Sequence, residues 1–346
     1  MKGKVLVVAP DRKTRGGITS VINSHENSVF WEKWNCVWIG TYVDRNALFK
    51  IIFFLQGLIV FLVQLPGTKI VHIHFSEPTS AIRKYIFLLI SKLFNLPVIV
   101  HFHSFSAKTT ISGKKKDLYK KIFNKADAII VLSNYWKKQV EQIVIKPGKI
   151  KVIYNPCPEV KQKSDLLKQK TILFAGTLNE RKGYSDLLRA FSKIAAQFPE
   201  WKIVFAGNGE IELAIKLSIS LNISNNVIFK GWISGMEKEK LFNTSTIFCL
   251  PSYAEGFPMA VLDAWAYGLP VITTPVGGLP DVLIHGKNAL VFQPGDIDML
   301  AENLKELMTN VNLRERLADA SLMLSSNLFN IKTISSQFDE LYTSIL

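Results

Sequence analysis

The residues best suited to chemistry are concentrated in the stretch 251–263, which reads PSYAEGFPMAVLD. An apolar run ends just before it, a loop with glycine and proline follows, and a helix is expected to begin near Pro258, because proline is favoured in the first turn of a helix. The backbone N–H groups of Phe257, Met259 and Ala260 would then lie at a helix start, where they can bind an anion. The stretch therefore predicts a phosphate-binding loop.

Two acidic residues accompany this helix start. Glu255 lies in the loop and Asp263 lies in the first part of the helix. Carboxylates accept hydrogen bonds from hydroxyl groups, so one acid could bind the sugar and the other the ribose of a sugar nucleotide. A helix whose acidic first turn is stabilised by the macrodipole explains the same residues, and both interpretations stay open at this point.

A basic loop, GTLNERKG at 176–183, follows a predicted strand and precedes a predicted helix. Its two adjacent cations, Arg181 and Lys182, could neutralise a diphosphate, because arginine offers a bidentate fork and lysine a point charge. Solvated surface charge is the alternative interpretation of these two residues.

Gly16 and Gly17 follow the first predicted strand and also allow two interpretations. They could let the backbone approach a phosphate closely, or they could form a simple tight turn.

Four histidines end two consecutive predicted strands, as HIH at 72–74 and HFH at 101–103. Alternate residues of a strand share one face, so each pair points the same way. No carboxylate or cysteine accompanies them at ligand spacing, so we expect no metal site there. His103 is the best candidate for contacting a sugar, and the other three are expected to be core or supporting residues.

Two further motifs resemble known binding sites in part only. The segment 206–212 starts like a dinucleotide-binding loop, but Glu212 replaces the third glycine and the next strand ends at Lys230 without an acid, so a nicotinamide cofactor is not expected. Asp296 and Asp298 have the spacing that metal-dependent sugar transferases use. They follow Gln-Pro-Gly and open an amphipathic helix, so N-capping explains them better.

The elements that position these residues alternate between short apolar strands and amphipathic helices, which predicts parallel β-α-β units. The pattern runs once, is interrupted by a polar linker at Glu159–Lys170, and restarts. We therefore expect an α/β fold of two Rossmann-like doubly wound domains, with ligands beyond the carboxyl ends of the strands in a cleft between the domains. The expected parts are 1–160, 161–328 and a C-terminal helix, 329–346, that crosses back onto the first domain.

Within this scheme the expected strands are Lys4–Ala9, Cys36–Ile39, Ile70–His74, Val98–His103, Ala128–Leu132, Ile150–Tyr154, Thr171–Ala175, Lys202–Ala206, Asn226–Phe229, Ile247–Leu250, Val271–Thr273 and Ala289–Phe292. The expected helices are Gly17–Ser24, Ala47–Leu65, Thr79–Phe94, Lys116–Asn124, Asn134–Ile145, Tyr184–Gln197, Glu210–Leu221, Met236–Asn243, Met259–Tyr267, Ile297–Thr309 and Asn330–Leu346.

Charge is distributed unevenly along the 346 residues, whose formal net charge is +14. Residues 1–165 carry 26 basic and 10 acidic side chains, whereas residues 166–346 carry 16 and 18. The first half therefore faces something anionic. A nucleic-acid partner is not expected, because the second half is acidic and no binding module is recognisable. The cysteines Cys36, Cys157 and Cys249 are scattered, which fits a reducing compartment. No signal peptide precedes the first strand, so a cytoplasmic location is expected.

The segment 47–65, ALFKIIFFLQGLIVFLVQL, is unusually apolar. Its uncharged part is shorter than the roughly 20 residues that span a bilayer. Three interpretations remain open: a helix buried between strands, a helix that lies in the membrane interface and a true membrane span.

Taken together, the segments resemble the family 4 glycosyltransferases over nearly the whole chain. The segments that carry the resemblance are RGG near the N-terminus, HFHS, GTLNERKG, FAGNGE, LPSYAEGFPMAVLDAWAYGLPVI and TPVGGLPDVLIHGKNALVF. The resemblance implies the GT-B fold, in which two Rossmann-like domains face each other. It also implies retaining transfer from a nucleotide-diphosphate sugar without a metal or other cofactor.

The resemblance also assigns roles. Arg181 and Lys182 match the pair that binds the donor diphosphate. Glu255 matches the first acid of the family's Glu–seven residues–Glu motif, at the reacting sugar, and Asp263 matches the second, on the ribose. Asp263 stands where the family has glutamate, so its reach is shorter by a methylene. Gly17 matches a glycine near the diphosphate, and His103 a histidine near the sugar. The remaining residues assigned to the donor are Gly16, Gly207, Asn208, Trp232, Gly256, Phe257, Pro258 and Met259.

The expected reaction moves a hexose from a UDP- or GDP-sugar to a hydroxyl of a saccharide acceptor, in which Glu255, His103, Arg181 and Lys182 take part. By analogy with the family, the acceptor is linked to a lipid diphosphate in polysaccharide assembly. The protein would then lie peripherally at the inner membrane surface, where the basic first half docks. The alternative function is a catalytically silent partner subunit that binds nucleotide sugars.

Overall fold

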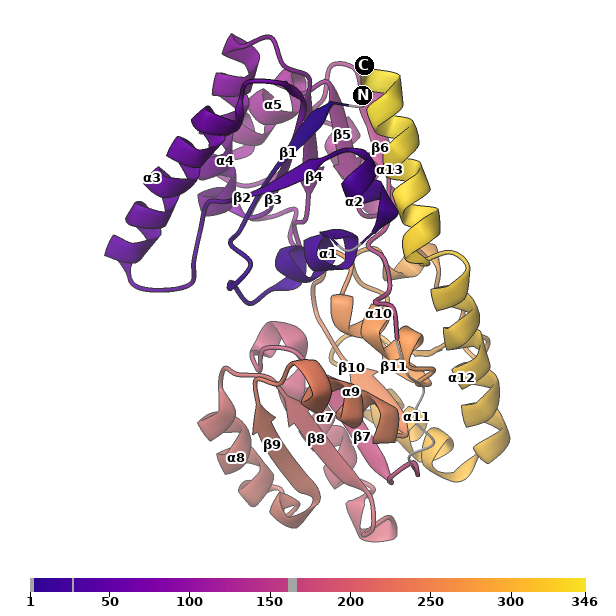
Figure 1. Cartoon of the computed structure of the whole chain (residues 1–346). Coiled ribbons are helices and arrows are strands. Elements are labelled where there is room, and N and C mark those ends of the chain that lie inside the picture. The colour runs from indigo at the N-terminus through magenta and orange to yellow at the C-terminus, as the bar shows by residue number, and fades with distance from the viewer. Residues whose placement is uncertain (1–2, 27, 161–166) are drawn as a thin grey trace. The chain divides into compact units, whose positions relative to one another are not determined.

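The computed structural model describes residues 3–26, 28–160 and 167–346, which fall into two compact units. The first unit contains the chain up to Pro156, the segment Glu255–Met259 and the C-terminal segment Phe329–Leu346. The second contains Cys157–Ala254 and Ala260–Leu328. Each unit is built on its own six-stranded parallel sheet (Figure 1). The central part of the expected linker, residues 161–166, lies outside the described residues.

The sheet of the first unit has the strand order β2-β1-β3-β4-β5-β6. Its strands are almost wholly buried, as expected for parallel strands with both faces covered. The bounds are β1 (Lys4–Ala9), β2 (Cys36–Gly40), β3 (Thr68–Phe75), β4 (Val98–Phe102), β5 (Ala128–Val131) and β6 (Ile150–Val152).

Helices cover both faces of this sheet, so each face has its own apolar core. One face is covered by α3 (Ala47–Gln64), α4 (Pro78–Leu93), α5 (Lys116–Lys125) and α6 (Asn134–Glu141). The other is covered by α1 (Gly17–Glu26), α2 (Val29–Lys33) and α13 (Ile331–Ile345), and a short 3-10 helix, η1 (Pro147–Lys149), precedes β6.

The C-terminal helix α13 belongs to the first unit (Figure 1). Asn330 caps its start, because the side chain accepts a hydrogen bond from the N–H of Lys332. Its apolar residues Ile334, Phe338 and Tyr342 are buried in the core with Phe30 and Trp34 of the segment around α2. This helix completes one face of the first sheet.

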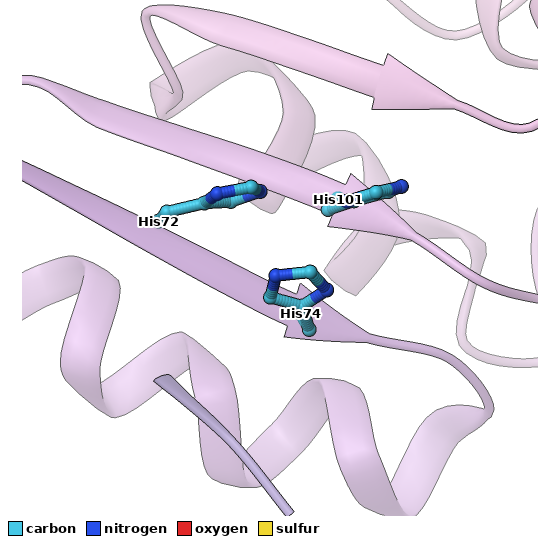
Figure 2. Close-up of side chains that lie close together, drawn as sticks. All are labelled: His72, His74 and His101. Atoms are coloured by element: carbon cyan, nitrogen blue, oxygen red, sulfur yellow. The ribbon is translucent and has the colours of Figure 1, made fainter. Parts of the chain in front are cut away.

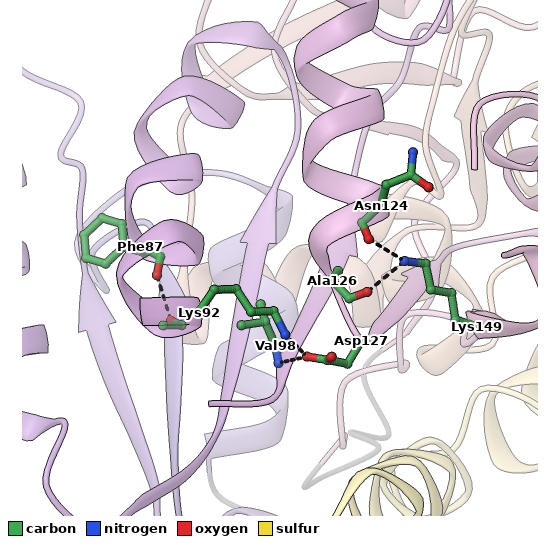
Figure 3. A network of polar contacts seen from close by, with 8 residues as sticks. Phe87, Lys92, Val98, Asn124, Ala126, Asp127 and Lys149 are labelled. Atoms are coloured by element: carbon green, nitrogen blue, oxygen red, sulfur yellow. Dashed lines mark hydrogen bonds and ion pairs between the residues drawn. The ribbon is translucent and has the colours of Figure 1, made fainter. Parts of the chain in front are cut away.

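A polar network joins the segments that lead into β4 and β5 of the first unit (Figure 3). The Asp127 carboxylate accepts a hydrogen bond from the Val98 N–H at 2.6 Å and forms an ion pair with Lys92. Lys149 Nζ donates to the carbonyls of Asn124 and Ala126 at 3.1 and 2.8 Å, and so satisfies the end of α5. These contacts hold the entry to β4 and β5 in register.

The second sheet has the order β12-β11-β10-β7-β8-β9, which is the order of the dinucleotide-binding fold. Its strands are β7 (Thr171–Ala175), β8 (Lys202–Ala206), β9 (Val227–Gly231), β10 (Ile247–Leu250), β11 (Val271–Thr273) and β12 (Leu290–Val291). Its helices are η2 (Glu180–Lys182), α7 (Tyr184–Ser192), η3 (Ala195–Gln197), α8 (Ile211–Ser220), η4 (Ser224–Asn226), α9 (Gly235–Thr244), α10 (Met259–Ala266), η5 (Leu279–Asp281), α11 (Ile297–Thr309) and α12 (Val311–Ser326), of which α10 starts in the first unit.

Strand order reverses between β7 and β10 in the second sheet and between β1 and β3 in the first. In open α/β sheets, ligands bind outside the carboxyl ends of the strands at such switch points. The loop that carries Arg181 and Lys182 follows β7, and the loop that leads to Glu255 follows β10. The topology therefore places the two main predicted motifs on neighbouring strands.

Helix α3 differs from one expectation. A helix buried between strands should expose little of its length, yet the buried residues of α3 are Gly57 and Phe61, and 11% of the helix is buried. The interpretation as a buried helix is therefore wrong, because only one side of α3 packs on the unit. Within the described residues, α3 is the one helix whose length and composition would allow it to cross a membrane.

Candidate active site

The basic loop after β7 has a defined local conformation. The Asn179 side chain accepts a hydrogen bond from the Lys182 N–H at 3.1 Å and so caps the turn η2. Gly183 follows with φ 71°, and a Cβ there would lie 2.0 Å from the Pro251 carbonyl oxygen. A glycine is therefore required at this position, where the loop after β7 meets the loop after β10. Arg181 and Lys182 sit on this turn.

Further contacts join the same two loops. Arg181 Nη1 donates to the Ala254 carbonyl at 2.6 Å, and the Arg181 carbonyl accepts from the Tyr253 N–H at 2.8 Å. The Tyr253 hydroxyl donates to the Asp186 carboxylate at 2.8 Å, and burial together with this bond raises the pKa of Tyr253 to about 12. Tyr253 therefore stays protonated at neutral pH and can donate this hydrogen bond. The bond from Arg181 to Ala254 holds the guanidinium at the residue that precedes Glu255.

The predicted residues of the loops after β8 and β9 also lie together. Gly207 packs against the loop after β7, because a Cβ there would lie 1.8 Å from the Gly176 carbonyl oxygen. Asn208 Oδ1 accepts a hydrogen bond from the Trp232 N–H at 2.9 Å. Trp232 is 43% exposed, so an aromatic side chain is presented beside the polar loop. Such a surface can stack on a planar ring.

Asp263 has an ion-pair partner that the sequence did not reveal. Lys238 Nζ of α9 lies 2.7 Å from Asp263 Oδ1 in α10. Burial raises the pKa of the Asp263 carboxyl, and Lys238 opposes that shift. The second carboxylate oxygen of Asp263 can still accept a hydrogen bond from a hydroxyl group, so the ion pair with Lys238 would orient the carboxylate for a ligand.

The segment Glu255–Met259 belongs to the first unit, as do Gly16, Gly17 and His103. The Glu255 side chain is nearly buried, with the residue 6% exposed. A Cβ on Gly256 would lie 2.7 Å from the Ser104 carbonyl oxygen, so this loop runs directly past the segment that follows β4.

The same segment is anchored at its other end. Asn155 Nδ2 donates to the Phe257 carbonyl at 3.3 Å, and the Phe257 ring packs on Tyr154 and Phe329. Pro258 is buried, and α10 starts at the next residue, Met259, close to the expected position. These contacts fix the loop on which Glu255 lies.

Gly17 lies at the start of α1 and faces this segment. A Cβ on Gly17 would lie 3.7 Å from Met259 Cγ, which is ordinary contact distance. Gly16 has φ 152° and no heavy atom within 4 Å of where a Cβ would lie. The backbone of Gly16 and Gly17 is therefore open to close approach by a ligand, in line with the choice of glycine there.

The two histidines of each pair point the same way, as predicted, and the rings of the two pairs lie against each other. Figure 2 shows His72 and His74 of β3 beside His101 of β4. His101 and His103 have ring centroids 4.1 Å apart, and His74 Nδ1 lies 3.0 Å from His103 Nε2. His103 is thus the outermost member of a stacked row, and His74 fixes the orientation of its ring.

Burial governs the protonation of this row. It lowers the pKa of His103 and His72 to about 3, and it lowers the pKa values of His74 and His101 well below 6.5. The rings are therefore neutral at physiological pH. Near Glu255 the protein presents a neutral imidazole, which can donate or accept a hydrogen bond without adding charge.

Among the described residues, the group of side chains that could jointly hold a metal ion is His72, His74 and His101, whose ligand atoms lie within 4.8 Å of one another. Their rings are stacked, with 9° between the planes of His72 and His101. Asp296 and Asp298, the other metal candidates, are otherwise engaged. Asp296 caps α11 through the Met299 N–H at 3.0 Å, which confirms the N-cap, and Asp298 pairs with Lys193.

Two family models match the chain in succession. Residues 7–159 match the model described as Glycosyltransferase Family 4, and residues 158–322 match the model described as Glycosyl transferases group 1. The chain belongs to the family 4 glycosyltransferases. This result confirms the resemblance inferred from the sequence motifs.

Individual proteins are similar as well. An uncharacterized glycosyltransferase of Haemophilus influenzae is 30% identical over 204 residues, which are 58% of this chain and 57% of that protein. The capsular polysaccharide biosynthesis glycosyltransferase CapM of Staphylococcus aureus is 26% identical over 175 residues, which are 50% of this chain and 46% of CapM. The matches thus span about half the length of these relatives.

The fold of this family 4 chain is shared with solved structures. The crystal structure of Anabaena Alr3699/HepE in complex with UDP-glucose has a TM-score of 0.78 and 17% sequence identity, and the match covers 99% of this chain and 100% of that one. This likeness confirms the GT-B fold class. The roles of the individual site residues are taken up as proposals.

Proposed function

We propose that this family 4 member is a retaining glycosyltransferase that moves a hexose from a UDP- or GDP-sugar to a hydroxyl of a saccharide acceptor. The observation that carries the proposal is the joined pair of loops after β7 and β10. They present Arg181 and Lys182 at a switch point of the second sheet, and Arg181 donates to the residue before Glu255. The complex of HepE with UDP-glucose supports a nucleotide-sugar donor by analogy.

In this proposal, the second unit binds the nucleotide diphosphate. Arg181 and Lys182 neutralise the charge that develops on the diphosphate as it leaves, and the N–H groups at the start of α10 add to this effect. The two side chains thereby perform the task that a divalent ion performs in metal-dependent transferases. We propose that no metal and no other cofactor is required.

The donor's remaining parts are assigned to the other loops. Asn208 and Trp232 lie where a planar base could stack, together with Gly207, and Asp263 binds ribose hydroxyls while Lys238 holds its carboxylate. Glu255, with Gly256, Phe257, Pro258 and Met259, contacts the sugar and the diphosphate. His103 donates a hydrogen bond to a sugar hydroxyl, and its orientation is set by His74.

Bond breaking leaves an oxocarbenium-like sugar, and the acceptor hydroxyl attacks from the face that the diphosphate has left. The bond between the anomeric carbon and the diphosphate oxygen breaks, and the bond to the acceptor oxygen forms. The acceptor's proton passes to the departing phosphate oxygen. The configuration at the anomeric carbon is therefore retained without a covalent enzyme intermediate.

The first unit is proposed to present the acceptor, a saccharide linked to a lipid diphosphate, in the assembly of a polysaccharide. The similarity to CapM supports polysaccharide synthesis. The basic excess of residues 1–165 and the exposed apolar helix α3 support a peripheral position at the cytoplasmic face of the inner membrane.

The test is a panel of nucleotide-diphosphate sugars, scored for hydrolysis of the donor and for thermal stabilisation in the presence of EDTA. We expect one donor to be turned over without metal. Glu255→Ala should abolish turnover and leave nucleotide binding largely intact, whereas a silent binding subunit would show binding and no turnover in the unsubstituted protein. An absolute requirement for a divalent ion would overturn the proposed role of Arg181 and Lys182.

A further inference from the structure

The first unit contains a cavity of about 460 Å³ that none of the assigned donor residues lines. This volume lies in the range of about 300–1,000 Å³ that is typical of small-molecule sites. The cavity is formed by the loop after β1, the loop after β2 and the first half of α3, at the carboxyl edge of the first sheet. Its lining residues are Lys13, Arg15, Val43, Asp44, Arg45 and Phe53.

The two loops that form the cavity are tied to each other. The Asp11 N–H and the Thr14 hydroxyl both donate to the Tyr42 carbonyl, at 2.8 and 2.9 Å. The Thr41 N–H donates to the Ala9 carbonyl at 3.0 Å. These contacts hold the two loops of the cavity rim together, so the backbone needs little ordering when an anion binds.

Positive charge dominates the cavity, with Lys13, Arg15 and Arg45 against one acid, Asp44. That acid is partly compensated, because it accepts a hydrogen bond from the Tyr42 hydroxyl at 3.1 Å and lies 3.8 Å from Lys50 Nζ. The cavity is therefore suited to an anion with several oxygens, such as a phosphate or a diphosphate.

Two more basic residues lie behind the same loop. The Arg83 guanidinium lies 4.5 Å from the centroid of the Tyr42 ring and extends the positive field at this edge of the sheet. The buried Lys84 amino group donates to the Thr41 hydroxyl, and burial lowers the pKa of Lys84 well below 10.5, so we do not count it as a cation.

An apolar surface begins at the cavity. Phe53 lines it, and α3 continues from there with large apolar side chains that are 38–70% exposed. They recur at helical spacing on the side opposite the packed residues Phe54 and Phe61. The exposed residues of α3 are Leu48, Phe49, Ile51, Ile52, Leu55, Ile59, Val60, Leu62 and Val63.

The apolar surface continues onto α4, because Phe54 and Phe61 of α3 pack edge-on against Phe87. The outer side of α4 exposes Ile82, Ile86, Leu89 and Leu93 at spacings of three and four residues. In soluble proteins, large exposed apolar surfaces mark binding sites. Its position beside a basic cavity requires an occupant with an anionic head and a hydrocarbon chain.

We propose that this basic cavity is the headgroup site for a lipid phosphate acceptor, whose hydrocarbon chain lies along the outer face of α3. The inference rests on the proposed function, in that the first unit presents the acceptor. Lys13, Arg15 and Arg45 bind the phosphate oxygens, and α3 holds the chain at the membrane surface. The saccharide then extends from the phosphate toward the segment that carries His103.

Direct binding of a soluble lipid diphosphate tests the assignment. Farnesyl diphosphate, inorganic diphosphate and farnesol are titrated by calorimetry against the full chain, with UDP and GDP in excess so that the nucleotide site is filled. Two variants address the two parts of the site, Lys13→Gln/Arg45→Gln in the cavity and Leu55→Asn/Ile59→Asn on α3. Arg15 is left in place because it adjoins Gly16.

The matched control removes the same charge elsewhere. Lys120 and Lys125 of α5 line a second basic depression, which is formed by α5 and not by the loops around the cavity. In Lys120→Gln/Lys125→Gln, general attraction of anions is reduced to the same extent. Melting temperatures of all variants establish that the fold is retained.

We expect the cavity variant to lower the affinity for farnesyl diphosphate by about tenfold or more, because charged hydrogen bonds are lost. For the same reason it should lower the affinity for inorganic diphosphate. The α3 variant should weaken the binding of farnesyl diphosphate and leave the binding of inorganic diphosphate unchanged. Equal loss in the α5 control, unchanged binding in the cavity variant, or no binding to the unsubstituted protein would overturn the inference. Donor hydrolysis by the unsubstituted protein is measured on the same sample, so failure of the proposed function is seen separately.

Discussion

Lys238 Nζ lies 2.7 Å from Asp263 Oδ1, and this pair links α9 to α10 within the second unit. The carboxylate is largely shielded from solvent, with its side chain 12% exposed, whereas the lysine is 35% exposed. In its burial, this ion pair is therefore intermediate between a surface pair and a fully buried pair. It supplies a cation to an acid that burial alone would tend to protonate.

Lys238→Met should make the stability of the protein depend on pH. Without the cation, the folded-state pKa of Asp263 rises further, and a raised acid pKa contributes stability that is lost as the pH rises through it. We expect a cost of about 1–2 kcal/mol in the free energy of unfolding at pH 8 and a smaller cost near pH 4. Urea unfolding measures both values. In an Asp263→Asn background the same substitution should cost little, and an equal cost there would contradict the pairing.

Arg181→Gln and Lys182→Gln should each lower kcat/KM for donor hydrolysis by about 10²–10³-fold, because each removes a donor aimed at the developing charge. Arg181→Lys should not restore activity fully, since the lysine cannot reproduce the arginine fork. Steady-state kinetics in EDTA provide the measurement. The matched control is Lys193→Gln, an exposed lysine that pairs with Asp298, which should leave kcat/KM unchanged. Normal kinetics in either site variant would remove the residue from the mechanism.

The row of buried histidines predicts acid sensitivity. An unfolded imidazole takes up a proton below about pH 6.5, whereas burial lowers the pKa of His72 and His103 to about 3 in the folded protein. The unfolded state therefore binds more protons between these values, and stability should fall as the pH falls through this window. Unfolding free energies measured at pH 7, 6 and 5 would show the decline, and a flat profile would contradict the burial of the row.

His101→Leu isolates one member of that row. Neither ring nitrogen of His101 has a hydrogen-bond partner among the described residues, so leucine should stabilise the protein slightly at pH 7. It should also reduce the slope of stability against pH by up to about 1.4 kcal/mol per pH unit. A strongly destabilised His101→Leu protein would show that the ring has a partner, such as a bound metal.

Gly57→Ala should destabilise the first unit even though alanine favours helices. A Cβ at Gly57 would lie 2.3 Å from the Gly40 carbonyl oxygen and 3.2 Å from Thr41 Cα, and backbone cannot move aside cheaply. We expect a loss of about 1–3 kcal/mol from this overpacking, after the gain in helix propensity of about 1 kcal/mol. Thermal unfolding provides the measurement. Gly148→Ala, where no atom lies within 4 Å of the added carbon, should change little.

Strands were easier to predict than helix ends. The bounds of β1, β7, β8, β10 and β11 agree with the sequence prediction, because each is a short apolar run between turn residues. The helix expected over Asn134–Ile145 instead ends at Glu141. Asn124 provides the reason, because its side chain bonds the Ile145 N–H and the Ile143 carbonyl and so replaces the helical partners.

The parts of the site that the sequence revealed are those that a local motif carries. Arg181 and Lys182 lie in a capped turn between a strand and a helix, so their place followed from the pattern alone. Lys238 was missed, because its partner lies 25 residues away in another helix and no periodicity links them. The exposure of α3 was equally hidden, since an apolar run shows which residues avoid water and not which neighbour covers them.

The position of α13 has a consequence for how the protein is made. The first sheet is complete in sequence by Val152, yet Ile334, Phe338 and Tyr342 of α13 cover one of its faces. During synthesis the part of that face under α13 must stay uncovered until the ribosome has translated the whole second unit, although α1 and α2 are already present. A nascent chain halted anywhere before α13 would therefore expose apolar residues on one face of the sheet, and it is at this stage that a chaperone would be needed.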